Sequence, residues 1–247
     1  MKEVYIAYFD FLGFKEFILN NDDVTLMRRM NHIFRDIEWT LGQGKRQPPR
    51  SGMIFADLSN SKINCLNISD TVVFWTNDTT SESLKDLFDV AYEFNWKENT
   101  FNFPVRGCIT KGKLSIVKGN HSSKKGGSYS LSCLYGEGII RAHTRAESQN
   151  WAGTVVDDII LKDFKELSEA EDFLKDYALK YKVPYKNGNN LNEEFVLRFS
   201  KGKLNYTAYE NMVKDIYRVF QQDNKPTDHP SVQCKLENTV KFLKEYR

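Results

Sequence analysis

The sequence predicts an α+β fold: a ferredoxin-like βαββαβ palm followed by a C-terminal, mostly helical extension. Two observations predict this fold. In the first half of the chain, runs of β-branched and aromatic residues alternate with helical patterns in the order strand, helix, two strands, helix, strand. The second half is more charged, and its patterns are mainly helical. We therefore expect a core domain over residues 1–157, with the extension at 158–247 packed on it.

The first strand and a later hairpin are the elements on which the functional argument depends. Residues 4–9 are almost all β-branched or aromatic, which predicts a buried strand that ends at Asp10. Two further strand patterns flank Ser69 and Asp70, which are typical turn residues. We therefore expect a hairpin with Asp70 at its turn.

The other elements follow from apolar residues at helical spacing or from β-branched runs, and two polar, glycine-containing segments at 43–52 and 119–127 predict loops. In chain order, the elements expected after the first strand are a helix at 13–41, strands at 62–68 and 71–76, a helix at 83–97, strands at 103–110, 113–117 and 129–135, a helix at 137–149, a strand near 154–156, and helices at 168–181, 206–222 and 235–246.

The composition is that of an ordinary globular protein, with 40% hydrophobic and 28% charged residues. The 35 Lys and Arg nearly balance the 33 Asp and Glu, so we expect neither nucleic acid nor a membrane surface as a partner. The four cysteines lie far apart, which favours reduced core residues over a zinc or redox motif. No apolar run approaches the roughly 20 residues of a membrane span, and we expect a cytoplasmic protein.

Asp10 and Asp70 are the candidate metal ligands. In a palm of this order, the end of the first strand lies beside the turn between the second and third, so the two carboxylates would converge. Converging carboxylates repel each other unless a cation lies between them, and Mg²⁺ or Mn²⁺ binds through one or two carboxylates plus substrate phosphates. Taken singly, Asp10 is equally well a helix cap and Asp70 a turn residue. Their joint placement favours a two-metal site for a nucleoside triphosphate.

The turn after Asp10 is the candidate phosphate-binding segment, with Leu12, Gly13 and Phe14 as its substrate-binding residues. It opens a helix, so its backbone N–H groups would point at a bound triphosphate, and Gly13 permits close approach. Glycine also serves ordinary turns. Phe14 taken alone is more typical of a core residue.

Arg141 and Arg145 are the candidate catalytic cations. On a helix they are four residues apart and share one face, which suits them to clamp phosphoryl oxygens. The alternative pairs Arg141 with Glu137 and leaves Arg145 on a solvated face. His143 points elsewhere and is expected to be structural.

Four strings carry a resemblance to a known family: AYFDFLGF at 7–14, ISDTV at 68–72, VRGCITKG at 105–112 and RAHTRAES at 141–148. They occur in the order seen in class III nucleotidyl cyclases. The resemblance covers roughly residues 4–153. In detail the chain looks most like the pyrimidine nucleotide cyclases of Pycsar anti-phage systems, which make cyclic UMP or cyclic CMP.

The resemblance implies a role for each matched residue. Asp10 and Asp70 would hold two Mn²⁺ or Mg²⁺ ions, with the Phe11 carbonyl as a further ligand. Arg145 matches the transition-state arginine of the family. Arg141 stands where purine cyclases carry an asparagine that orients the ribose, so it would contact phosphate or sugar instead. The family also implies a cyclase-like catalytic domain at 1–157. It further implies a head-to-tail homodimer with composite active sites, in which the metal aspartates and the arginine come from different subunits.

The substrate expected from the resemblance is a pyrimidine triphosphate. Purine cyclases read the base with a lysine and an acidic residue, and Leu66 and Leu134 lie near those places, with Asn67 and Tyr135 as polar neighbours. A site without hydrogen-bonding partners for the purine edge cannot select it. We expect UTP to be converted to 3′,5′-cyclic UMP and pyrophosphate as an antiviral second messenger, read by a separate effector protein.

Three alternatives remain. The first is a cytidylate cyclase that uses CTP. The second is a catalytically inactive, cyclase-like nucleotide-binding or dimerisation module, although retention of both aspartates and Arg145 weighs against it. The third is another palm nucleotidyltransferase, disfavoured because no Gly-Gly-Asp/Glu-Glu-Phe turn is present.

Overall fold

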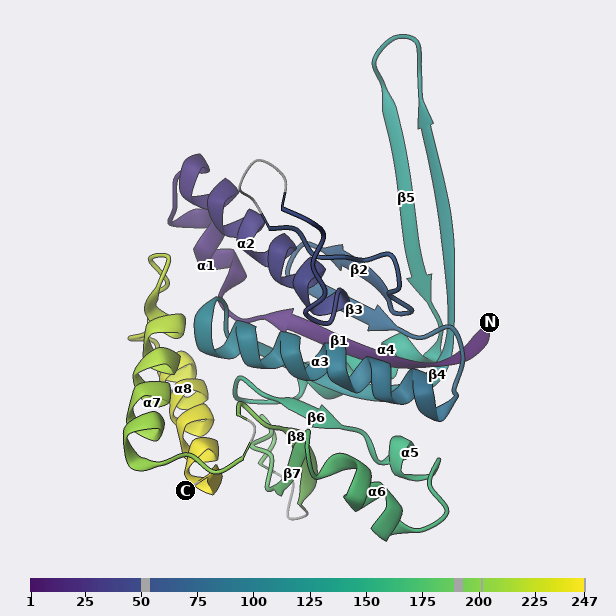
Figure 1. The fold of residues 1–247 in the computed structure, drawn as a ribbon. Helices are drawn as coiled ribbons and strands as arrows, with labels where there is room; N and C mark the ends of the chain where they lie inside the picture. Colours follow the sequence, from purple (N-terminus) through teal and green to yellow (C-terminus); the bar gives the residue numbers. More distant parts are fainter. Residues whose placement is uncertain (50–53, 189–192, 201, 247) are drawn as a thin grey trace.

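A mixed β-sheet runs through the middle of the protein, with strand order β2-β3-β1-β4-β6-β8-β7 and β5 paired to β4 (Figure 1). The computed structural model describes residues 1–49, 54–188, 193–200 and 202–246. The strands are β1 (Lys2–Phe11), β2 (Asn64–Ile68), β3 (Thr71–Trp75), β4 (Val105–Ser122), β5 (Ser128–Tyr135), β6 (Thr154–Val156), β7 (Ala178–Tyr181) and β8 (Glu194–Leu197). The helices are α1 (Phe14–Leu19), α2 (Asp23–Leu41), α3 (Ser81–Phe101), α4 (Glu137–Glu147), α5 (Asp158–Leu161), α6 (Leu167–Leu174), α7 (Tyr206–Gln221) and α8 (Pro230–Leu243).

The expected palm is confirmed. Strand β1 pairs antiparallel with β3 on one side and with β4 on the other. Its side chains alternate between two hydrophobic clusters, as the period of a strand requires. Phe9 belongs to the cluster under α2 and α3, whereas Ile6 and Tyr8 belong to the cluster under α4. By the same alternation, Asp10 lies on the α4 face of the sheet.

In the first half of the chain, the expected elements differ from those observed at two places. The helix predicted over 13–41 is divided into α1 and α2, because the Asp22 side chain accepts a hydrogen bond from the Thr25 amide (2.8 Å) and begins a new helix. The two strands predicted at 103–110 and 113–117 form the single long strand β4. With β5 it makes a hairpin that projects far from the body of the molecule (Figure 1).

The C-terminal segment continues the sheet and adds helices to it. Strand β6 runs parallel to β4, and β8 and β7 follow antiparallel. The helix predicted over 168–181 ends at Leu174, and Ala178–Tyr181 forms β7. The helical character of the extension is confirmed by α7 and α8, and the division of the chain at residue 157 stays a prediction. None of the helices in the described ranges is long and apolar enough to cross a membrane.

Two residues of the loop between α7 and α8, Asp223 and Asn224, form a clamp on α1 and α2. Asp223 and Asn224 both adopt positive φ angles, 62° and 55°. The Arg29 Nε donates to the Asp223 carboxylate (2.9 Å), and the Asn20 side chain donates to the Asn224 carbonyl (3.0 Å). These contacts hold the end of α1, and α2, against the C-terminal extension.

Candidate active site

Asp10 and Asp70 lie at adjoining ends of β1 and β3. Asp10 is opposite Thr71 in the antiparallel pair, and the Phe11 amide donates to the Asp70 carbonyl (2.9 Å). Burial raises the pKa of the Asp10 carboxyl, Arg106 lowers that pKa, and the charge of Asp70 raises it. The backbones of Asp10 and Asp70 therefore adjoin, as expected for the ends of these strands.

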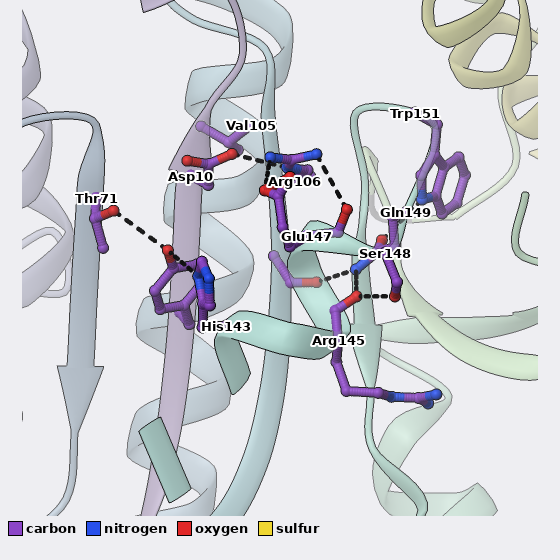
Figure 2. Close-up of polar contacts among 12 residues, drawn as sticks. Asp10, Thr71, Val105, Arg106, His143, Arg145, Glu147, Ser148, Gln149 and Trp151 are labelled. Atoms are coloured by element: carbon purple, nitrogen blue, oxygen red, sulfur yellow. Dashed lines mark hydrogen bonds and ion pairs between the residues drawn. The ribbon is translucent and has the colours of Figure 1, made fainter. Parts of the chain in front are cut away.

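Arg106 is the main partner of Asp10. Its Nε donates to Asp10 Oδ2 (2.7 Å), and its two terminal nitrogens donate to the carboxylate and the main-chain carbonyl of Glu147, at the end of α4 (Figure 2). Arg106 is only 8% exposed, so this bridge lies in a largely desolvated place. The bridge fixes the Asp10 carboxylate relative to both β4 and α4.

The sequence contained a signal for this bridge that our prediction did not use. Arg106 interrupts an otherwise apolar strand, and a buried arginine needs anionic partners. Its partners are 96 and 41 residues away along the chain, so their identity could not be inferred locally.

The donor set fits Mg²⁺ or Mn²⁺. Carboxylate and carbonyl oxygens are the ligands these ions prefer, and Asp10, Asp70 and the Phe11 carbonyl come from one short stretch of the β1–β3 edge. Within the described part of the chain, no group of three or more Asp, Glu, His or Cys side chains gathers to hold a metal. Mg²⁺ commonly binds through one or two carboxylates plus substrate phosphates, and the Asp10–Asp70 pair suits that mode of binding.

In the turn after Asp10, two backbone amides already have hydrogen-bond partners. The Phe11 and Leu12 amides already donate to the Asp70 and Pro104 carbonyls (2.9 and 2.8 Å), so the Leu12 amide is not available to phosphate in this conformation. Gly13 adopts a left-handed φ of 78° as it caps α1. The Phe14 ring stacks on Phe11, with 6.3 Å between ring centroids, which supports the core interpretation of that side chain.

Arg145 forms an ion pair within its own chain. Its guanidinium donates to Glu194 on β8, and the Tyr185 hydroxyl donates to the other Glu194 oxygen (2.8 Å). Figure 2 shows the Arg145 side chain pointing away from Asp10 and Arg106. The solvated face proposed in our alternative is therefore wrong for Arg145.

Arg141 is the more exposed of the two arginines, with 47% of its side chain accessible. Its nearest carboxylate is Asp157, at 3.9 Å, rather than the Glu137 of our alternative interpretation. Helix α4 thus carries both arginines toward the β6–β8 side of the sheet, away from Asp10 of the same chain.

Comparison with known proteins identifies the fold. No protein-family model matches the sequence, and no curated protein matches it. Among solved structures, the catalytic core of a rhodopsin-guanylyl cyclase with converted specificity, in complex with ATPαS, superposes with a TM-score of 0.50 at 11% identity, covering 79% of this chain and 95% of that chain. The guanylate cyclase domain of RhGC from Catenaria anguillulae, in complex with GTP, gives 0.49 at 11% identity, covering 80% and 96%. The chain has a class III nucleotidyl cyclase-like fold.

In this cyclase-like fold, Leu66 and Leu134 pack against the same hydrophobic cluster on the α4 face. The Asn67 amide donates to the Thr71 carbonyl (3.0 Å), so that group is engaged within its own hairpin. Tyr135 is 46% exposed. The two leucine positions are therefore apolar in the structure as well as in the sequence.

His143 contacts the neighbourhood of the two aspartates. The Tyr8 hydroxyl lies 3.1 Å from His143 Nδ1 and 3.3 Å from Thr71 Oγ1, which connects α4 to the β3 residue that follows Asp70 (Figure 2). Burial raises the pKa of the Tyr8 hydroxyl. These contacts fit the structural role expected for His143.

Proposed function

We propose that the chain is a nucleotide cyclase that converts UTP to 3′,5′-cyclic UMP and pyrophosphate, and that this product is an antiviral second messenger read by a separate effector protein. The observation that carries the proposal is the pairing of Asp10 and Asp70 at adjoining strand ends of a class III cyclase-like fold. The similarity to solved structures concerns the fold alone. The activity is inferred from the aspartate pair.

Each residue of the site has a role in this reaction. Two divalent cations held by Asp10, Asp70 and the Phe11 carbonyl would supply the charge that lowers the pKa of the ribose 3′-hydroxyl. Arg106 orients Asp10 and favours its ionised form. The 3′-oxygen attacks the α-phosphorus as the bond to pyrophosphate breaks, and the arginines of α4 neutralise the developing charge.

The directions of these side chains support a homodimer. Arg141 and Arg145 face away from Asp10 in one chain, so a complete site requires the arginines of a partner subunit. The projecting β4–β5 hairpin exposes Val117 (47%) and Tyr129 (55%), which suits a surface covered by a second copy. In that dimer, Arg145 would exchange Glu194 for a phosphate oxygen.

The pyrimidine preference is supported by Leu66 and Leu134. Both are packed in an apolar cluster and offer no charged group to a purine edge. The preference for UTP over CTP rests on the resemblance, and a cytidylate cyclase is the alternative within this class.

A different class of function also has an observation in its favour. Asp10 and Arg145 are both held in ion pairs inside the chain, which is the arrangement expected of a nucleotide-binding or dimerisation module that does not turn over. Turnover separates this alternative from the proposed one.

The deciding experiment is incubation of the purified protein with Mn²⁺ and each of UTP, CTP, ATP and GTP, followed by mass spectrometry of the products. We expect cyclic UMP, with much less product from ATP and GTP, and none from an Asp10→Ala control. Cyclic AMP or cyclic GMP formed as fast as cyclic UMP would contradict the pyrimidine assignment. No cyclic product from any of the four would contradict the cyclase itself.

The composite site has its own test. Asp70→Ala and Arg145→Ala chains should each be inactive alone, and a mixture should regain activity because one of the two sites in a heterodimer would be intact. Subunit exchange is followed independently, with differently tagged chains. If exchange is complete and no activity returns, the arginine does not act across the interface.

A further inference from the structure

A cavity of about 420 Å³ opens beside the turn that follows Asp10. The palm contributes Leu12 and Gly13 to its lining, and the C-terminal extension contributes Lys225, His229 and Lys235. The two halves of the chain therefore meet at this cavity. Its lining is rich in groups that are or can become positively charged, with Glu16 as an acidic member.

Lys225 is a buried cation that lacks a hydrogen-bonded anion. The residue is 6% exposed, and its Nζ has no hydrogen-bond partner within the described ranges. Nζ lies 4.3 Å from the centroid of the Phe103 ring, and its side chain would lie 3.1 Å from a Cβ placed on Gly13. Burial lowers the Lys225 pKa to about 8. A buried ammonium of this kind is stabilised by an anionic ligand.

Lys235 is the second lysine of the cavity lining. It lies on the second turn of α8, where its Nζ donates to the Ser231 carbonyl (3.3 Å). Burial lowers its pKa, and so does repulsion from Arg106, the residue that binds Asp10. Leu12 and Gly13 of the lining follow Asp10 and Phe11 in the chain, so the cavity lies beside the end of β1 that carries Asp10.

We propose that this cavity binds the β- and γ-phosphates of the nucleoside triphosphate, and that Lys235 and Lys225 of the C-terminal extension are binding residues for them. The proposal rests on the proposed function and extends it to a part of the chain outside the cyclase resemblance. The cavity lies beside the turn that follows Asp10. With the α-phosphate at the two aspartates, the β- and γ-phosphates would extend into this cavity. The leaving pyrophosphate carries several negative charges, which the two lysines would offset.

The test measures binding of inorganic pyrophosphate by calorimetry, in EDTA at fixed ionic strength, so that only protein groups hold the anion. We expect Lys235→Gln to weaken binding about tenfold and Lys235→Arg to retain it. Lys241→Gln is the matched control, because Lys241 is an exposed lysine on the same helix, and it should bind as the parent does. Lys225→Met provides a second variant that removes the buried charge and is also expected to bind more weakly.

Three binding results would each overturn the proposal: pyrophosphate binding that is unchanged in both Lys235→Gln and Lys225→Met, absence of pyrophosphate binding to the parent protein, or binding no tighter than that of sulfate. A KM for UTP that is unchanged in both variants would overturn it while the cyclase assignment stands. Lys235-dependent pyrophosphate binding by a protein that makes no cyclic nucleotide would support the subsite and contradict the proposed function.

Discussion

Replacing Glu194 by alanine is expected to destabilise the protein substantially. Glu194 is 8% exposed and accepts hydrogen bonds from both Arg145 and the Tyr185 hydroxyl. Alanine would leave a largely buried guanidinium and a phenol hydroxyl without these partners. Removing one member of a buried ion pair costs about 3–5 kcal/mol. Because 32% of the Arg145 side chain remains in contact with solvent, we expect the lower end, about 3 kcal/mol.

For a chain of this length, about 3 kcal/mol corresponds to a Tm lower by roughly 6–12 °C. The Glu194→Gln side chain keeps two atoms that can take part in hydrogen bonds, so the free energy of unfolding should fall by only about 1 kcal/mol. Asp172→Ala is the matched control, since Asp172 forms an ion pair with Lys175 in which both side chains are exposed, 79% and 64%. Its effect should be below about 0.5 kcal/mol.

Urea unfolding followed by circular dichroism measures these differences as changes in the free energy of unfolding. If Glu194→Ala proves no less stable than Asp172→Ala, the Arg145–Glu194 pair does not contribute to the fold as the structure indicates. Arg145 would then be freer to act across a dimer interface than we infer.

Two further predictions concern the site and the buried lysine. Asp10→Ala or Asp70→Ala should lower cyclic nucleotide formation at least about 100-fold with the circular dichroism spectrum unchanged, and near-normal turnover at saturating Mn²⁺ would contradict their role. The Lys225 pKa is lowered from 10.5 to about 8, so between these values the unfolded chain binds more protons than the folded one. Stability attributable to Lys225 should therefore rise with pH across that interval, by on the order of 3 kcal/mol, and Lys225→Met should lack this rise. Parallel stability–pH curves for parent and variant would refute the assignment.

Local patterns were sufficient to predict the palm and the placement of the two aspartates. Strand β1 is predictable because residues 4–9 are almost all β-branched or aromatic, as a strand covered on both faces requires. The hairpin is predictable because Ser69 and Asp70, two typical turn residues, lie between two strand patterns. The pairing of β1 with β3 brings the end of β1 to that turn. The placement of Asp10 beside Asp70 can therefore be predicted without knowledge of any side-chain contact.

Contacts between distant residues could not be predicted in the same way. The Arg145–Glu194 pair spans 49 residues and depends on β8 joining the sheet, which a four-residue strand does not signal. Strand β7 begins three residues after the end of α6. Its short apolar pattern continues that of the helix, so the sequence predicts a single helix over 168–181. The same limit explains why the cavity lined by Lys225 was not anticipated.

The clamp formed by Asp223 and Asn224 also sets the point in synthesis at which α1 and α2 acquire these contacts. The clamp joins Arg29 to a residue 194 positions later, and Asn20 to one 204 positions later. At roughly 5–20 residues per second, a ribosome needs about 10–40 s to make the intervening chain. Until then α1 and α2 lack these contacts, whereas the turn after Asp10 already has its partners at Asp70 and Pro104. A fragment that stops before Asp223 would therefore lack the anchoring of α1 and α2 by the extension.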